Sequence, residues 1–329
     1  MFTSILILIS SLALLIISGH GLVKGSVSIA SRFHISSLVI GMTIVAFGTS
    51  APELIVSLRA AIDGHPDIAV GNVVGSNIAN VALVLGLTAI VIALPVVSKR
   101  LFSDWLFMMI SYFFLWLFFQ SGTIERYQGV IMVVAIIIFT WRAIKTSMSR
   151  NKTEEEKVDK AYPVWLAIVI VLVACAGLAW GADLLVKSAS DIASSLGVSE
   201  RVISVTVVAF GTSVPELTAS LVAAFKKETE ISVGNIVGSN LFNILVVLGI
   251  TSVIHPIPVD YMAFRIDLLW MAILGILLML VIYPFKANLT AWKADRNIRI
   301  LADLRNGRLS FWGGLMLFLL YIAYIALLF

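Results

Sequence analysis

Two glutamates stand directly after prolines inside apolar stretches of this chain, an unusual place for a charged group. Glu53 lies in AFGTSAPEL, which begins at Ala46, and Glu216 lies in AFGTSVPEL, which begins at Ala209. An ionisable group at membrane depth costs at least a few kcal/mol and usually faces a protein interior or an aqueous pathway. Two carboxylates that meet in such a place would supply hard oxygen ligands for one divalent cation or two monovalent cations.

Hydroxyl groups share the helical face of each glutamate. Thr49 and Ser50 precede Glu53 by four and three residues, positions that lie on one face of a helix. The second copy of the motif repeats this arrangement with Thr212 and Ser213. We predict that these hydroxyls join the carboxylates in coordinating a cation.

A proline four residues after a glycine predicts a break in each of these helices. Pro52 cannot donate to the carbonyl of Gly48, and its ring pushes that carbonyl aside. Pro215 stands in the same relation to Gly211. Irregular backbone is tolerated at membrane depth only where it is buried or lines a cavity. We therefore expect free main-chain oxygens on the N-terminal side of each break, close to the carboxylates.

A second motif follows each glutamate, GNVVGSNIAN from Gly71 and GNIVGSNLFN from Gly234. The glycines four residues apart are typical of helices that approach closely, so we assign them to packing. Polar residues recur at every fourth position and share one helical face, which predicts a role in the site. These residues are Asn72, Ser76 and Asn80 in the first copy and Asn235, Ser239 and Asn243 in the second.

Composition indicates the kind of protein that carries these motifs. The chain has 329 residues, of which 60% are hydrophobic and 13% charged, whereas soluble domains have about half and about a quarter. A helix needs about 20 apolar residues to span a bilayer. We predict an all-α integral membrane protein with ten transmembrane helices, at residues 3–23, 36–62, 67–94, 101–119, 125–146, 162–186, 199–225, 230–255, 262–284 and 309–328.

The chain contains an internal repeat. Residues 41–86 align with residues 204–249 at a constant offset of 163 without a gap, and 26 of the 46 pairs are identical. Five helices per half is an odd number, so the second half enters the membrane from the opposite side, as in inverted-repeat secondary transporters. We predict five-helix repeats over residues 1–148 and 162–329, joined by a short charged cytoplasmic linker over residues 149–161.

The basic residues predict the orientation in the membrane. With ten spans, 18 of the 23 Lys and Arg residues fall in loops on one side and 5 on the other. Because cytoplasmic loops are rich in Lys and Arg, we predict a multi-pass protein of the cell (inner) membrane with both termini on the outer side. The expected partners are the lipid bilayer and small inorganic cations. Nothing indicates a nucleic acid, a protein partner or a cofactor, and Cys175, the single cysteine, excludes a cysteine-based metal cluster.

The paired motifs resemble the calcium/cation antiporter superfamily, specifically its sodium/calcium exchanger branch and the small prokaryotic members of that branch. The resemblance implies a secondary active antiporter that exchanges sodium for calcium by alternating access at a midplane site. The segments that carry it are Gly48–Glu53, Gly71–Asn80, Gly211–Glu216 and Gly234–Asn243.

The resemblance also implies roles for individual residues. Glu53 and Glu216 would be the central cation ligands, with Thr49 and Thr212 beside them. Well-studied exchangers have an aspartate where this chain has Asn243, so this site has one possible charge or proton acceptor fewer. The other implied ligands are Ser50, Ser213, Ala46, Ala209, Ser76, Ser239, Asn80 and Asn243.

Other functions are open at this point. A proton-coupled calcium/cation antiporter would use the same carboxylates as proton carriers, and transport driven by a pH gradient without sodium would indicate it. A cation channel could carry similar carboxylates, and flux without counter-transport would indicate that class. Two acids could also act as general acid and base, but no third group supports a reaction, so we predict that the protein is not an enzyme.

Overall fold

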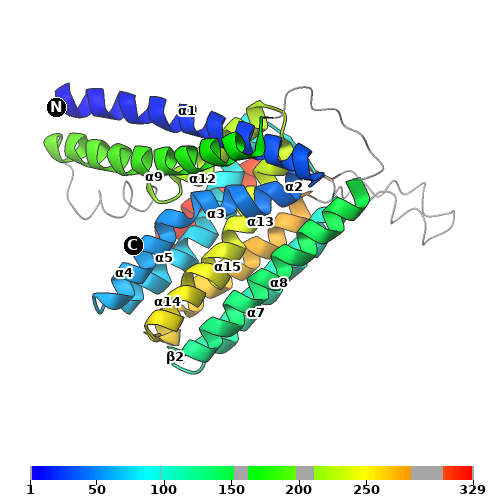
Figure 1. Ribbon diagram of the computed structural model, residues 1–329. Coiled ribbons are helices and arrows are strands. Elements are labelled where there is room, and N and C mark those ends of the chain that lie inside the picture. Colours follow the sequence, from blue (N-terminus) through cyan, green and yellow to red (C-terminus); the bar gives the residue numbers. More distant parts are fainter. Residues whose placement is uncertain (1, 97, 152–161, 198–210, 283–306, 328–329) are drawn as a thin grey trace.

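The computed structural model describes residues 2–96, 98–151, 162–197, 211–282 and 307–327. In these residues the chain is mostly helical, with two short antiparallel ribbons (Figure 1). This agrees with the predicted all-α membrane class. The segments 152–161 and 198–210, which include most of the predicted linker and the site residue Ala209, lie outside the described residues.

The first half of the chain is a series of helices interrupted by two π-helical turns. Such turns are rare and occur mostly as single bulges in α-helices, often at functional sites. The elements are α1 (Phe2–Phe33), α2 (Ser37–Ile40), η1 (Gly41–Val45), α3 (Ala46–Thr49), α4 (Ala51–Ile62), α5 (Pro66–Ala79), η2 (Asn80–Leu85), α6 (Gly86–Val91), β1 (Leu94–Val96), α7 (Ser98–Phe119), β2 (Thr123–Ile124) and α8 (Arg126–Asn151).

The second half repeats much of this order. Its described elements are α9 (Val164–Ser195), α12 (Val214–Phe225), α13 (Thr229–Phe242), η4 (Asn243–Leu248), α14 (Gly249–Ile254), β3 (Ile257–Pro258), α15 (Tyr261–Ile282), β4 (Gly307–Leu309) and α17 (Phe311–Leu327). The pairs α4 and α12, α5 and α13, and α7 and α15 begin and end 163 residues apart. This is the offset of the sequence repeat, so equivalent residues form equivalent elements.

The number of membrane spans is only partly tested by the structure. Among the described residues, seven helices are long and apolar enough to cross a membrane, and the bent pair Ser37–Thr49 and Ala51–Ile62 would be an eighth. The apolar helices α12 and α17 are shorter, at 12 and 17 residues. The predicted span 199–225 begins outside the described residues, so the count of ten stays a prediction.

The two interrupted helices form the centre of the bundle. In α5–η2–α6 and in α13–η4–α14, 83% of the apolar stretch is buried, against 22% in α1 and 28% in α9. A helix buried among other helices can carry polar side chains that lipid would not tolerate. The polar motifs predicted from the sequence therefore lie in the part of the bundle that can hold them.

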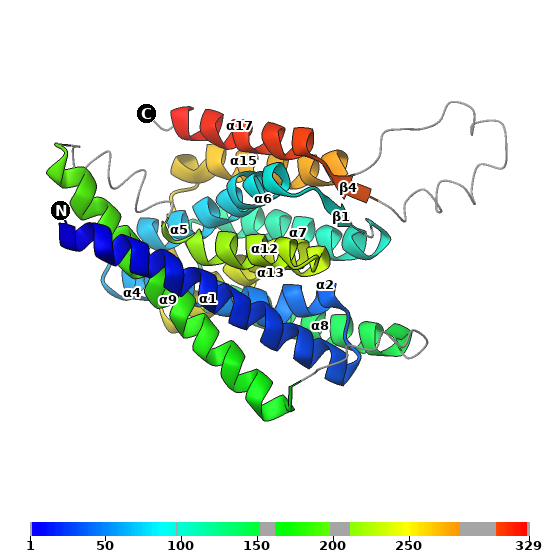
Figure 2. The same ribbon diagram turned by 90° about the horizontal axis from the view of Figure 1, so that it is seen from above.

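Helices α1 and α9 form a separate pair on the outside of the bundle, as both views show (Figures 1 and 2). They pack chiefly on each other, and α1 also contacts α12. Small residues allow this contact, since a methyl group added at Gly177 or Gly181 would clash with Ser18 or Leu15 of α1. The apolar residues of this pair belong to a core cluster distinct from that of the central helices.

Two short ribbons connect the two halves of the chain. Strand β1 pairs with β4, with Leu94 opposite Leu309, and β2 pairs with β3, with Thr123 opposite Pro258. Figure 2 shows β1 and β4 at the end of the molecule opposite to the start of α1 and the finish of α17. The two chain ends thus share one end of the bundle, while the side of the membrane that they face stays a prediction.

Candidate cation site

The first glutamate motif forms a bend between two helices. The helices on either side, Ser37–Thr49 and Ala51–Ile62, meet at 46°. Ser50 lies between them with φ −90° and ψ 5°. Pro52 stands in the first turn of α4, where α4 itself offers no acceptor for an N–H, so proline is tolerated there. Glu53 lies in the same turn, where the helix dipole favours a carboxylate.

The bend leaves the main-chain oxygen of Ala46, one of the implied ligands, hydrogen-bonded within the helix. Gly48 is helical, and the break falls two residues after it. The carbonyl oxygen of Ala46 accepts from the Ser50 main-chain nitrogen at 2.9 Å and from Thr49 Oγ1 at 3.3 Å. Pro52 removes only the bond to the Gly48 carbonyl, so the helix continues through Thr49.

The second glutamate motif has the same local geometry where the structure describes it. Thr212 and Ser213 form a turn before α12, and Ser213 has φ −89° and ψ 0°, close to the values of Ser50. Pro215 and Glu216 lie in the first turn of α12. Equivalent residues therefore bring both carboxylates to the start of a helix.

Four buried oxygen atoms in the centre of the bundle have no hydrogen-bond partner among the described residues. They are Glu53 Oε2, Glu216 Oε2, Asn80 Oδ1 and Asn243 Oδ1, and the exposed fraction of each of these residues is 1% or less. The only other buried side-chain oxygen or nitrogen atoms of the described residues without a partner are the hydroxyls of Ser26, Ser232 and Thr251. An unpaired buried acceptor costs about 1–3 kcal/mol, which a bound cation would offset.

The elements that carry these oxygens contact one another across the two halves. Helix α4, with Glu53, contacts η4, which begins at Asn243. Helix α12, with Glu216, contacts η2, which begins at Asn80. Each amide is thus the first residue of a π-helical turn and lies on an element that packs against a glutamate-bearing helix of the other half.

Hydroxyl groups of the first motif reach residues of the second half. Ser50 Oγ donates to Glu216 Oε1 at 3.2 Å. Thr49 Oγ1 donates to Asn235 Oδ1 at 3.2 Å and lies 3.3 Å from Ser239 Oγ. These bonds bring four of the predicted ligands together, namely Thr49, Ser50, Glu216 and Ser239.

The structure describes four of the five remaining predicted ligands. Ser76 and Ser213 are buried and Thr212 is half-buried. None of the three makes a side-chain hydrogen bond to either glutamate among the described residues. Ala46 is buried, and Ala209 lies outside the described residues.

The first asparagine of each second motif stabilises the local helix pair. Asn72 Nδ2 donates to the main-chain oxygen of Glu53 at 3.3 Å and to Ser57 Oγ at 2.9 Å. Asn235 Nδ2 donates to the main-chain oxygen of Glu216 at 3.4 Å. These asparagines hold the glutamate-bearing helix against the next helix, a role that the polar stripe alone did not indicate.

Sequence reasoning did not single out two further asparagines of the second motif. Asn80 Nδ2 donates to Asn240 Oδ1 at 3.0 Å, and Asn243 Nδ2 donates to Asn77 Oδ1 at 3.2 Å. Both are fully buried. They stand at equivalent positions of the repeat, and this identity of a buried polar residue in both copies was the available signal.

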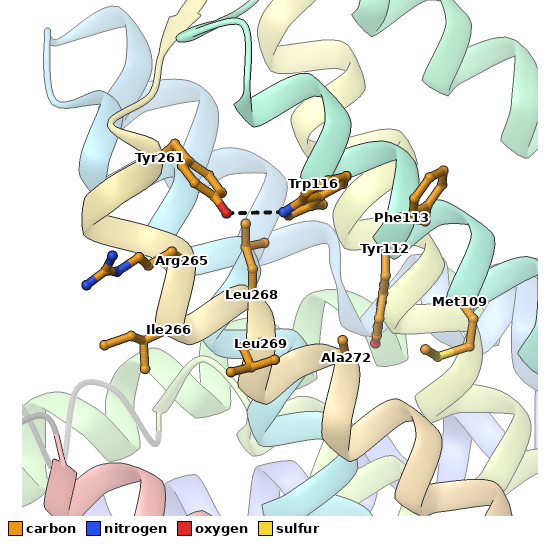
Figure 3. Close-up of a pocket in the computed structure, with 10 residues that line it drawn as sticks. All are labelled: Met109, Tyr112, Phe113, Trp116, Tyr261, Arg265, Ile266, Leu268, Leu269 and Ala272. Atoms are coloured by element: carbon orange, nitrogen blue, oxygen red, sulfur yellow. Dashed lines mark hydrogen bonds between the residues drawn. The ribbon is translucent and has the colours of Figure 1, made fainter.

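A groove of about 650 Å³ between α7 and α15 is not a second cation site (Figure 3). Its lining is largely apolar and includes Arg265 but no acidic residue. At its rim, Trp116 Nε1 donates to Tyr261 OH at 3.3 Å. Tyr112 in its wall has a hydroxyl that accepts from Asn240 Nδ2 at 2.9 Å, which connects this wall to the amides of the central site.

The chemistry of the central group selects the class of cation. Among the described residues, no group of three or more His, Cys, Asp or Glu side chains could hold a metal ion. The central group offers carboxylate, amide and hydroxyl oxygens only. Oxygen donors of this kind suit alkali and alkaline-earth cations better than the transition metals that prefer nitrogen or sulfur.

Comparison with known proteins identifies the family of this chain. The family model described as "Sodium/calcium exchanger protein" matches residues 3–145 and 166–329. The chain belongs to the sodium/calcium exchanger family. The predicted family is therefore confirmed, and a family of membrane transporters agrees with the expectation that the protein is not an enzyme.

Two relatives and one solved structure illustrate the family likeness. Inner membrane protein YrbG of Escherichia coli (strain K12) is 33% identical over 288 residues, which cover 84% of this chain and 87% of that protein. Sodium/calcium exchanger MaX1 of Methanosarcina acetivorans is 29% identical over an alignment of 367 positions, which takes in 98% of each protein. The structure of the sodium-calcium exchanger NCX_Mj soaked with zero Na⁺ and Ca²⁺ has a TM-score of 0.78 at 30% identity and covers 99% of both chains.

Proposed function

We propose that this member of the exchanger family carries calcium across the membrane in exchange for sodium, by alternating access at one site shared by both halves. The observation that carries the proposal is a set of four buried oxygens, two from each half, that lack a partner within the described ranges and lie on elements that contact one another. Family membership and the likeness to MaX1 and NCX_Mj support the choice of sodium and calcium.

Competition for the same oxygens would couple the two fluxes. Calcium takes six to eight oxygen ligands, so two carboxylates and two amides leave positions for hydroxyls or water. One calcium ion balances the two negative charges of Glu53 and Glu216, and so do two sodium ions. Because both kinds of ion need these carboxylates, binding of one excludes the other, and a site that opens to each side in turn exchanges them.

We place this exchange in the cell membrane, within the ten-helix, two-repeat arrangement predicted from the sequence. The equal lengths and constant offset of the paired elements support an arrangement in which each half supplies one glutamate and one amide. The proposed orientation, with both termini outside, is supported by the excess of Lys and Arg in the loops assigned to the inside.

Liposomes test this proposal directly. Purified protein is reconstituted with internal sodium, and uptake of radioactive calcium is followed with a sodium gradient or with a pH gradient alone. We expect uptake that requires the sodium gradient and is abolished in Glu53→Gln and in Glu216→Gln. Glu125→Gln, an exposed residue at the end of β2, is the matched control and should transport normally. Near-normal uptake in either site variant would contradict the two-carboxylate site.

A proton-coupled cation antiporter is the alternative, because Asn243 leaves the described site with two acids. Uptake driven by the pH gradient alone would keep the site and make its carboxylates the proton carriers. Calcium flux that needs neither gradient nor counter-ion would instead indicate a channel.

A further inference from the structure

Each amide of the site is held by an asparagine from the other half of the chain. Asn80 Nδ2 donates to Asn240 Oδ1 at 3.0 Å, and Asn243 Nδ2 donates to Asn77 Oδ1 at 3.2 Å. All four side chains are at most 1% exposed. The nitrogen end of each ligand amide is thus occupied, and its oxygen has no partner in the part of the chain that the structure describes.

The direction of an amide decides whether it binds or repels a cation. Its oxygen is an acceptor and its NH₂ group is a donor with partial positive charge. A half-turn about the last side-chain bond exchanges the two at almost no change in shape. An asparagine therefore serves as a cation ligand only where something keeps its oxygen turned inward.

The surroundings of Asn240 fix its own direction. Its Nδ2 donates to Tyr112 OH at 2.9 Å and to the main-chain oxygen of Asn77 at 3.4 Å. A main-chain carbonyl can only accept, so the NH₂ group must face it and Oδ1 must face Asn80. The direction of Asn80 follows, since only its NH₂ group can donate to that oxygen.

Asn240 Nδ2 also donates to the sulfur of Met108 at 3.8 Å, and among the described residues a sulfur contact of this kind is all that the Nδ2 of the equivalent Asn77 makes. Asn77 Nδ2 donates to the thioether sulfur of Met271 at 3.7 Å. A thioether is a weak acceptor, so it gives Asn77 the same direction with less energy. The Asn80 side of the site is consequently held more firmly than the Asn243 side.

We propose that Asn240 and Asn77 are positioning residues that turn the amide oxygens of Asn80 and Asn243 toward the cation, each acting across the interface between the halves. Neither residue need touch the ion. The inference rests on the proposed cation site and adds the groups that set the direction of its neutral ligands.

A double-mutant cycle separates this role from simple packing. Equilibrium binding of radioactive calcium to purified protein is measured for Asn240→Leu in three backgrounds, namely the parent, Asn80→Ala and Asn243→Ala. We expect Asn240→Leu to weaken calcium binding about 10- to 100-fold in the parent, as is typical when the partner of a metal ligand is lost. The loss of calcium affinity should vanish in the Asn80→Ala background and persist in the Asn243→Ala background. Asn243 is the matched control because it lies in the same half of the chain as Asn240, three residues after it.

Tyr112→Phe provides a variant that removes one hydroxyl and leaves the packing intact. We expect calcium binding to weaken about 2- to 10-fold, the equivalent of one neutral hydrogen bond, and again only where Asn80 is present. This variant decides the question if Asn240→Leu fails to fold, as judged by gel filtration.

The outcomes distinguish this inference from the proposed function. The cation site stands if the parent binds calcium and Glu53→Gln abolishes that binding. In that case the positioning role is wrong if Asn240→Leu and Tyr112→Phe weaken calcium binding equally with and without Asn80. If the parent binds neither calcium nor sodium, the proposed function and the positioning role both fail.

Discussion

At the scale of single residues, the two halves of the site are built from the same motif but are bonded differently. Ser50 Oγ donates to Glu216 Oε1 at 3.2 Å. Ser213, its equivalent, makes no such bond to Glu53 among the described residues. The carboxylate of Glu216 is therefore oriented by the Ser50 hydroxyl from the other half, whereas in the described part of the chain Ser213 does not do the same for Glu53.

This difference predicts unequal effects of two matched substitutions. Ser50→Ala removes a buried hydrogen bond to a carboxylate, which is worth about 1.5–3 kcal/mol, so we expect calcium affinity to fall about 10- to 100-fold. Ser213→Ala should have a smaller effect. Calcium-dependent uptake rates in liposomes, fitted for apparent KM, provide the comparison, and equal losses in the two variants would contradict the assigned bond.

The amide of Asn243 predicts a second effect at this scale. Asn243→Asp places an acceptor where Nδ2 now donates to Asn77 Oδ1. A protonated carboxyl group can restore that bond and an ionised one cannot, so the variant should resemble the parent at low pH and diverge from it as the pH rises. Uptake measured against pH tests this, with the unsubstituted protein as reference. A pH profile unchanged from the parent would place residue 243 outside the site.

The sequence identified the buried polar residues of the central group better than the bonds between them. Glu53, Glu216, Asn80 and Asn243 could be selected because polar residues at membrane depth recur in both copies of the motif. The roles of Asn77 and Asn240 could not, because a hydrogen bond between halves depends on how the halves pack, which a helical period does not contain.

At the scale of elements, the bend before Glu53 depends on one missing donor. Pro52 cannot donate to the carbonyl of Gly48, whereas the Ala46 carbonyl still receives the Ser50 main-chain N–H. This is why the break falls after Thr49 rather than at the glycine. A sequence pattern identifies the proline that causes a break but not the residue at which the hydrogen-bond ladder first fails.

Removing that proline should straighten the helix. Pro52→Ala supplies the missing N–H, so we expect the 46° bend between the two helices to shrink. Because Ser50 and Glu53 lie at this bend, straightening it should displace both side chains, and calcium uptake should fall at least about tenfold. Thermal stability should be unchanged or higher. Pro66→Ala at the start of α5, where no bend depends on the proline, is the control. Full transport by Pro52→Ala would show that the bend is not needed.

Close contact between α13 and the η1 segment predicts a packing effect. A methyl group at Gly238 would lie 2.5 Å from the main-chain Cα and oxygen of Met42. Gly238→Ala should therefore destabilise the protein by about 1–3 kcal/mol, seen as a lower Tm in detergent. Gly21→Ala is the control, because its methyl group would be in ordinary contact at 3.5 Å from Ala174. An unchanged Tm for Gly238→Ala would contradict the packing described for these elements.

At the scale of the whole molecule, the fold relates the two chain ends to each other, and the charge pattern predicts the side of the membrane on which they lie. Helix α1 begins and α17 finishes at the same end of the bundle (Figure 2). This agrees with an even number of spans but does not select a side. The excess of basic residues in alternate loops makes that selection.

Fusions to alkaline phosphatase test the orientation, because this enzyme becomes active only outside the cytoplasm. A fusion after Phe329 should be active and one after Arg150 inactive. The reverse pattern would invert the predicted topology while leaving the site unchanged.

The balance of charged and neutral ligands has an electrical consequence. On the proposed function, a site of two carboxylates and two amides carries two negative charges when unloaded and none when it holds one calcium or two sodium ions. Turning an unloaded, doubly charged site across a low-dielectric interior is costly. The unloaded site would thus not switch from one side of the membrane to the other, and ion leak without exchange would be suppressed with no separate gate. One calcium exchanged for two sodium ions would be electrically silent, whereas a third sodium ion would make each cycle respond to voltage by about 2.3 kcal/mol per 100 mV.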